Sequence, residues 1–125
     1  MVVDDDAAMR GLLVDELSEV GCTVVQASDG LEAFSHLQVR HPTLVITDLN
    51  MKFGGLEFVR NLKSAIPECP IIVLTAFGDA QTKSLTKAIG VAGYFDKPVR
   101  MANLRSLVKQ VCPQSQCQHV QVKNP

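Results

Sequence analysis

The sequence has no tryptophan, a single tyrosine and almost no net charge. Its 12 basic and 13 acidic side chains leave a formal charge of −1, so no overall field favours a nucleic acid or an anionic membrane surface. The apolar runs are only a few residues long, too short to cross a bilayer. With 125 residues, of which 46% are hydrophobic, we expect one globular domain whose core needs no disulfide or metal.

The four cysteines, Cys22, Cys69, Cys112 and Cys117, indicate neither a metal site nor a disulfide framework. They occur singly, with no C-x-x-C pair and no histidine at zinc-finger spacing. The N-terminus lacks the charged and apolar regions of a secretory signal. We therefore expect free thiols in a reducing compartment, and hence a cytoplasmic protein.

Short, continuous apolar segments alternate along the chain with segments of helical periodicity. The predicted strands are residues 1–3, 23–27, 44–47, 71–74 and 93–95. Continuous β-branched runs are typical of strands that are covered on both faces, as in a parallel sheet. The β–α alternation, repeated five times, predicts a doubly wound, five-stranded parallel sheet, (βα)5, in a three-layer α/β sandwich.

Capping residues and apolar stripes mark the predicted helices. Gly21 and Gly90 end two of them, and Asp29 with Glu32 forms a capping box at the start of another. The expected inward-facing residues are Met9, Leu13, Leu17 and Val20; Leu31, Phe34 and Leu37; Leu56, Val59 and Leu62 or Lys63; Leu85, Ala88 and Ile89; and Met101, Leu104, Leu107, Val108 and Val111.

The two ends of the chain differ from its middle. After Cys112 the sequence is polar and rich in glutamine, so we expect a folded domain over residues 1–111 and a polar tail or truncated linker over residues 112–125. At the start, only three residues precede the first aspartate. We therefore expect a clipped first strand, from a truncated chain or in a domain of reduced stability.

Polar side chains follow four of the predicted strands, at the point where each strand ends. They are Asp4, Asp5 and Asp6 after the first strand, Asp48 after the third, Thr75 after the fourth and Lys97 after the fifth. In an open α/β sheet, ligands bind beyond these carboxyl ends. Carboxylates gathered there repel one another, and a hard divalent cation, which we expect to be Mg²⁺, relieves the repulsion.

A carboxylate beside a metal ion and a lysine is a competent phosphoryl acceptor. We expect Asp48 to be the nucleophile, Lys97 to supply a second cation and Thr75 to donate its hydroxyl to a phosphoryl oxygen. Taken singly, each residue has a plainer role, such as a helix N-cap for Asp6 or a turn for Asp48. Their occurrence at successive strand ends favours one shared site.

Four segments together carry a resemblance to a known family. They are Val2-Val3-Asp4-Asp5-Asp6, Val45-Ile46-Thr47-Asp48-Leu49-Asn50-Met51, Val73-Leu74-Thr75-Ala76 and Tyr94-Phe95-Asp96-Lys97-Pro98. As a set they resemble the receiver domain of two-component response regulators, from Val2 to about Val111. The resemblance implies a flavodoxin-like sandwich with strand order 2-1-3-4-5.

The resemblance also implies a role for residues in each segment. The implied roles are metal binding for Asp4, Asp5, Asp48 and the Asn50 backbone carbonyl, phosphoryl acceptance for Asp48, phosphate binding for Lys97, and switching for Thr75 and for Tyr94, whose rotamer follows Thr75. The implied cofactor is Mg²⁺.

A phosphorylation-dependent signalling switch in a phosphorelay is the implied function. A sensor histidine kinase or a histidine phosphotransfer protein would donate the phosphoryl group, and a conformational shift of residues 79–111 would reach a downstream output domain or protein. The domain would catalyse only its own phosphorylation and dephosphorylation. No direct contact with nucleic acid or membrane is expected.

One loop departs from the family pattern. Met51-Lys52-Phe53-Gly54-Gly55 lacks the usual proline after the methionine and is one residue short. Because this loop carries the Asn50 carbonyl, and because glycine adds freedom where proline would restrict it, we expect a looser loop and weaker metal binding.

Two other functions fit the same residues. A docking module of the same fold would act without phosphorylation, which the altered loop makes conceivable. A haloacid-dehalogenase-like phosphatase would use Asp4, Asp6 and Thr75, but the chain is short for that fold and Asp48 and Lys97 would lose their roles.

Overall fold

The computed structural model describes residues 1–76 and 78–111. Its strands are β1 (Val2–Val3), β2 (Gln26–Ala27), β3 (Val45–Asp48), β4 (Ile71–Thr75) and β5 (Gly93–Asp96). They form one parallel sheet in the order β2-β1-β3-β4-β5. The helices are α1 (Ala7–Glu19), α2 (Gly30–Leu37), α3 (Gly55–Ala65), α4 (Ala80–Ile89) and α5 (Met101–Val111). The predicted tail over residues 112–125 lies outside the described residues.

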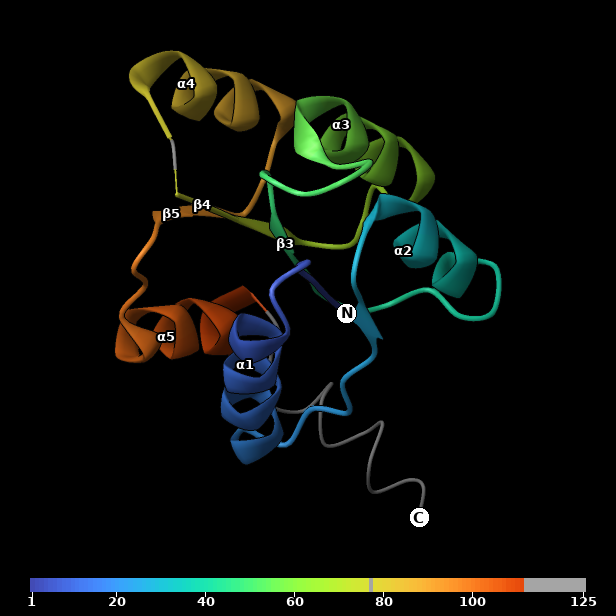
Figure 1. The fold of residues 1–125 in the computed structure, drawn as a ribbon, viewed down its shortest axis with the longest axis vertical. Helices are drawn as coiled ribbons and strands as arrows, with labels where there is room; N and C mark the ends of the chain where they lie inside the picture. The colour runs from blue at the N-terminus through green and yellow to red at the C-terminus, as the bar shows by residue number, and fades with distance from the viewer. Residues whose placement is uncertain (77, 112–125) are drawn as a thin grey trace.

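The helices cover both faces of the sheet. Helices α1 and α5 lie on one side, and α2, α3 and α4 lie on the other (Figure 1). The doubly wound, three-layer α/β sandwich expected from the βα alternation is therefore confirmed, as is the strand order that the resemblance implied. Among the described helices, none has the length and apolarity that a membrane crossing requires.

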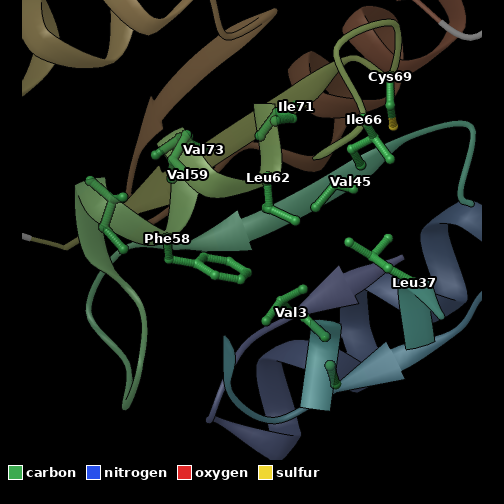
Figure 2. Close-up of a cluster of buried hydrophobic side chains, with 13 residues drawn as sticks. Val3, Leu37, Val45, Phe58, Val59, Leu62, Ile66, Cys69, Ile71 and Val73 are labelled. Carbon is green, nitrogen blue, oxygen red and sulfur yellow. The ribbon is translucent and has the colours of Figure 1, made fainter. Parts of the chain in front are cut away.

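Alternation along the strands divides the core in two. Val2 packs on the side of α1 and α5, and the next residue, Val3, packs on the side of α2 and α3, both with no exposed surface. Figure 2 shows the second side, where Val45 of β3 and Phe58 of α3 belong to the same cluster as Val3. Because successive strand residues point to opposite faces, a strand needs an unbroken apolar run to fill both sides.

Aspartates cap the N-termini of three helices, α1, α2 and α4. Asp6 Oδ1 accepts hydrogen bonds from the backbone N–H groups of Ala8 and Met9 at 3.0 and 3.4 Å, so its N-cap role is confirmed. Asp29 caps α2 by accepting from the Glu32 N–H at 2.8 Å. The Glu32 carboxylate accepts from the Ser28 N–H at 2.6 Å, so the predicted capping box is displaced by one residue.

Two predicted helix faces are wrong in detail. Leu31 is 59% exposed, so its predicted inward position is wrong, whereas Leu37 is buried as predicted. Gly30 and Ala33 are buried as well, and at Gly30 the backbone of α2 abuts the loop that follows β3. In α4 the fully buried residue is Thr86, whose hydroxyl donates to the Lys83 carbonyl at 2.9 Å. The helix satisfies this hydroxyl itself, so a polar residue occupies an inward position that an apolar pattern cannot detect.

The first two strands are short. Each has two residues in the ladder, with Val2 paired to Gln26 and Val3 paired to Ala27. The predicted strand over residues 23–27 shortens because β2 pairs only with β1, whose ladder ends after two residues. The short length of the first strand matches the sequence expectation.

Neighbouring leucines in α1 provide a test of the core. Leu13 is 1% exposed and Leu12 is 55% exposed. Leu13→Ala should lower the free energy of unfolding by about 2–5 kcal/mol, because it removes buried methyl groups and leaves a cavity. Leu12→Ala should change it by less than about 0.5 kcal/mol. Urea denaturation of both variants checks this, and equal losses would contradict the assigned burial.

Candidate functional site

Adjacent strands bring three carboxylates together at one edge of the sheet. Asp4 follows β1, Asp48 ends β3, and these strands are paired in the sheet. One oxygen from each of Asp4, Asp5 and Asp48 lies within 4.8 Å of the others. Asp4 and Asp48 are buried at 0% and 4% exposure, whereas Asp5 is exposed. The predicted convergence of these acids is thus observed, with one of them facing solvent.

Lys97 reaches this cluster from the end of β5, which is separated from β3 by β4. Its Nζ lies 3.2 Å from Asp4 Oδ2 and 3.1 Å from Asp48 Oδ2, so one ammonium group bridges two buried carboxylates. The backbone N–H of Lys97 donates to the Thr75 carbonyl at 2.8 Å, which ties the residue directly after β5 to the end of β4. The peptide bond between Lys97 and Pro98 is cis.

The second oxygen of each buried carboxylate accepts a backbone hydrogen bond. Asp4 Oδ1 accepts from the Asp6 N–H at 2.9 Å, and Asp48 Oδ1 accepts from the Asn50 N–H at 3.1 Å. Arg10 of α1 donates from Nη1 to the Asp4 carbonyl at 2.7 Å. Both carboxylates are therefore held from two directions, by the local backbone and by Lys97.

Burial and charge act against each other in this site. Desolvation is the main cause that raises the pKa of Asp4 above its ordinary value, and the neighbouring Asp48 charge adds to it, whereas the Asp6 N–H and Lys97 oppose it. Desolvation lowers the pKa of Lys97, but hydrogen bonds and charges from Asp48 and Asp4 outweigh it and raise the pKa overall. Lys97 therefore stays charged, but its charge alone does not offset the desolvation of the Asp4 carboxylate.

The donor set suits a hard divalent cation. Three carboxylates offer oxygen ligands close together, and one of them faces solvent, where water can complete a coordination shell. The raised pKa of Asp4 shows that further positive charge would stabilise its ionised form. The residues present therefore fit Mg²⁺ with retained waters.

Asn50 has a contact that the sequence did not reveal. Its side-chain Nδ2 donates to the Thr75 hydroxyl oxygen at 2.9 Å. Thr75 ends β4, is 1% exposed, and belongs to the strand beside β3. Sequence reasoning assigned only the backbone carbonyl of Asn50. A polar residue two positions after Asp48 indicated that the Asn50 side chain could contact the site. Its partner, Thr75, could be identified only from the register of β3 against β4.

Tyr94, the predicted aromatic switch, lies half-buried on β5. Its hydroxyl is buried and finds no hydrogen-bond partner among the residues that the structure describes. Desolvation, followed by the charges of Asp96 and Asp79, raises the pKa of Tyr94. A Cβ atom at Gly78 would lie 1.7 Å from the Tyr94 hydroxyl, so only glycine at that position leaves room for the ring.

Local contacts hold the loop after β3 even though it lacks the proline. The Gly54 N–H donates to the Met51 carbonyl at 3.1 Å, and the Gly30 N–H donates to the Lys52 carbonyl at 3.3 Å. Phe53 takes the left-handed conformation with φ of 53°. These contacts constrain the loop, while the weaker metal binding expected from the sequence stays a prediction.

Comparison with known proteins identifies the family. The family model described as "Response regulator receiver domain" matches residues 1–109. The chain belongs to this family. A receiver domain is a phosphorylation-dependent signalling domain of two-component systems rather than a classical enzyme. This assignment, with the strand order of the sheet, does not favour either of the alternative functions considered from the sequence.

Individual relatives of this receiver domain differ in length. The chain is 35% identical over 112 residues to "Probable transcriptional regulator ycf27" of Cyanophora paradoxa, covering 89% of this chain and 46% of that protein. It is 28% identical to "Sporulation initiation phosphotransferase F" of Bacillus subtilis, covering 90% of this chain and 92% of that one. It therefore spans about half of the first relative, at 46%, and nearly all of the second, at 92%.

Solved structures show the same architecture. The chemotaxis protein CheY4 of Vibrio cholerae superposes with a TM-score of 0.79 at 31% sequence identity, over 88% of this receiver domain and 94% of that chain. The receiver domain of NtrX from Brucella abortus gives a TM-score of 0.80 at 26% identity, over 88% and 94% of the two chains.

The raised pKa of Asp4 predicts a pH-dependent gain from Asp4→Asn. In metal-free buffer at pH 7, this variant should be more stable than the wild type, because asparagine avoids burying a charge that the folded state disfavours. A carboxyl whose folded pKa exceeds its unfolded value loses stability as pH rises through the interval between the two. The gain should therefore vanish below the ordinary pKa of 3.8.

Urea denaturation at several pH values, with a chelator present, measures this gain. Asp6→Asn is the matched control, because asparagine also caps helices well and Asp6 lies at the start of α1. A gain from Asp4→Asn that stayed constant from pH 3 to pH 7 would contradict the assigned cause.

Proposed function

We propose that Asp48 accepts a phosphoryl group from a phosphohistidine of a sensor histidine kinase or a histidine phosphotransfer protein. The observation that carries the proposal is the placement of a buried Asp48 carboxylate between Lys97 Nζ, at 3.1 Å, and the other two acids of the cluster. A nucleophilic carboxylate flanked by an ammonium and a cation-binding acid cluster is suited to phosphoryl transfer.

Asp4, Asp5 and Asp48, with the backbone carbonyl of Asn50, would hold Mg²⁺. When bound, this ion neutralises charge on the phosphoryl oxygens as they approach the carboxylates. Lys97 supplies the second positive charge and must divide its hydrogen bonds between the two buried acids and the incoming group. Asp4 supports the site by holding Lys97 at 3.2 Å and does not itself need to react.

The transfer forms one bond and breaks another. An Asp48 carboxylate oxygen attacks phosphorus, the P–N bond to the donor imidazole breaks, and the imidazole nitrogen keeps the electron pair. Later attack by water on the acyl phosphate regenerates the carboxylate and releases inorganic phosphate. Both steps act on the domain's own Asp48, so the domain turns over no separate substrate.

Thr75 and Lys97 connect the site to the rest of the fold. Phosphorylation adds about 1.5 to 2 negative charges, and the Thr75 hydroxyl and Lys97 ammonium are the neighbours able to compensate. Thr75 ends β4, shortly before α4 begins at Ala80, and Lys97 directly follows β5, shortly before α5 begins at Met101. Their movement would shift the population of conformations in residues 79–111, with Tyr94 following Thr75.

The output partner is part of the proposal. The relative named a transcriptional regulator is about twice as long as its matched region, at 46% coverage, so a downstream domain or a separate protein would receive the signal. Residues 1–111 would form the receiver and residues 112–125 a polar tail or linker. Direct contacts with nucleic acid or membrane are not proposed, and the sequence favours a cytoplasmic location.

Phosphorylation of purified protein tests the acceptor. Incubation with a small phosphodonor and Mg²⁺ should add one phosphoryl group to the wild type, as detected by intact mass spectrometry. Asp48→Asn should abolish the addition, because the amide is not nucleophilic. Asp6→Asn, which keeps the helix cap, should be labelled like the wild type. Label retained by Asp48→Asn, or found on Asp4, would overturn the proposal.

The bond from Asn50 to Thr75 predicts a shifted switch. Asn50→Ala keeps the backbone carbonyl but removes the donor 2.9 Å from the Thr75 hydroxyl. A net hydrogen bond contributes about 0.5–1.5 kcal/mol, so release of Thr75 should tighten beryllofluoride binding in the presence of Mg²⁺ by up to about tenfold. Isothermal titration calorimetry measures this. Unchanged Mg²⁺ affinity is the internal control, and weaker beryllofluoride binding would refute the prediction.

A further inference from the structure

The N-terminus of α2 abuts the loop that follows β3. Gly30, the first residue of α2, is buried and donates its N–H to the Lys52 carbonyl at 3.3 Å. A Cβ atom at Gly30 would lie 1.8 Å from the Phe53 carbonyl oxygen and 2.9 Å from its carbon. Both atoms belong to the loop backbone, so a larger residue would force the chain itself to move.

The helix side of this contact is firmly held. Asp29 accepts from the Glu32 N–H at 2.8 Å, and the Glu32 carboxylate accepts from the Ser28 N–H and hydroxyl at 2.6 and 2.9 Å. Ala33 and Leu37 anchor the same helix in the core. A clash at Gly30 would therefore displace the loop in preference to the helix.

The loop side is under backbone strain. Phe53 adopts φ of 53°, a left-handed conformation that is unfavourable for a residue with a Cβ atom. Its side chain is 54% exposed, so burial of the ring does not offset this cost. A strained backbone conformation persists where neighbouring atoms impose it, and the backbone of Gly30 lies against that of Phe53.

The loop segment that contacts Gly30 is continuous with the acidic site. Asn50 lies two residues before Lys52, its N–H donates to Asp48 Oδ1 at 3.1 Å, and its side chain donates to Thr75. The distance between this loop and α2 therefore determines the position of Asn50, which contacts both the acceptor Asp48 and the Thr75 hydroxyl.

We infer that Gly30 is a positioning residue for the metal and acceptor site. Its missing side chain lets α2 hold the backbone of Lys52 and Phe53, and this contact takes the place of a rigid proline in keeping the Asn50 carbonyl where Mg²⁺ binds. The inference rests on the proposed function for the identity of the ion.

Gly30→Ala tests the inference, with Gly11→Ala as its matched control. Both glycines lie in helices, but a Cβ at Gly11 meets nothing within 4 Å. Loss of an outer support typically weakens metal binding about 10–100-fold, so Gly30→Ala should lower the Mg²⁺ affinity at least about tenfold in calorimetric titration. Gly11→Ala should leave that affinity within about twofold of the wild type, since it touches no part of the site.

A second variant approaches the contact from the loop. Phe53→Gly accepts the positive φ without strain and frees the loop to move, so it should weaken Mg²⁺ binding by severalfold while unfolding remains cooperative. This variant decides the matter if Gly30→Ala does not fold. Wild-type Mg²⁺ affinity in whichever of the two variants folds would overturn the inference. Failure of the wild type to bind Mg²⁺ or to become labelled at Asp48 would instead overturn the proposed function.

Discussion

The site depends on one ammonium group shared between two buried carboxylates. Lys97 Nζ lies 3.2 Å from Asp4 and 3.1 Å from Asp48, and both acids have almost no exposed surface. The single ammonium does not fully compensate the burial of the carboxylates, an imbalance that shows in the pKa of Asp4, which desolvation raises. The fold thereby keeps a place where additional positive charge is stabilising, and the chemistry of a cation-assisted acceptor follows from that imbalance.

The parallel topology of the sheet makes this arrangement possible. All five strands end at the same edge of the sheet, so residues distant in sequence, such as Asp4 and Lys97, meet there. The apolar strand interiors supply the rigid support beneath them, with Val3, Val45 and Val73 fully buried in one cluster. Chemistry is thus confined to the strand ends, while the strand interiors stabilise the domain.

Much of this could be predicted from the sequence because each step used local patterns. Continuous apolar runs between helical stripes predicted the sheet, and charged residues directly after those runs predicted the site. Features that depend on contacts across the fold could not be found in this way. The Asn50 side chain needed the register of β3 against β4, and the outward position of Leu31 needed the close approach of Gly30 to the loop.

The side-chain sizes at positions 78 and 94, which are distant in the sequence, are linked by the space that Tyr94 occupies. Its buried hydroxyl occupies the volume into which any Cβ at Gly78 would project. A descendant of this chain that acquired even an alanine at position 78 would need a smaller or reoriented ring at position 94. Substitutions at the two positions should therefore arise as pairs during divergence, although one residue belongs to a loop and the other to a strand.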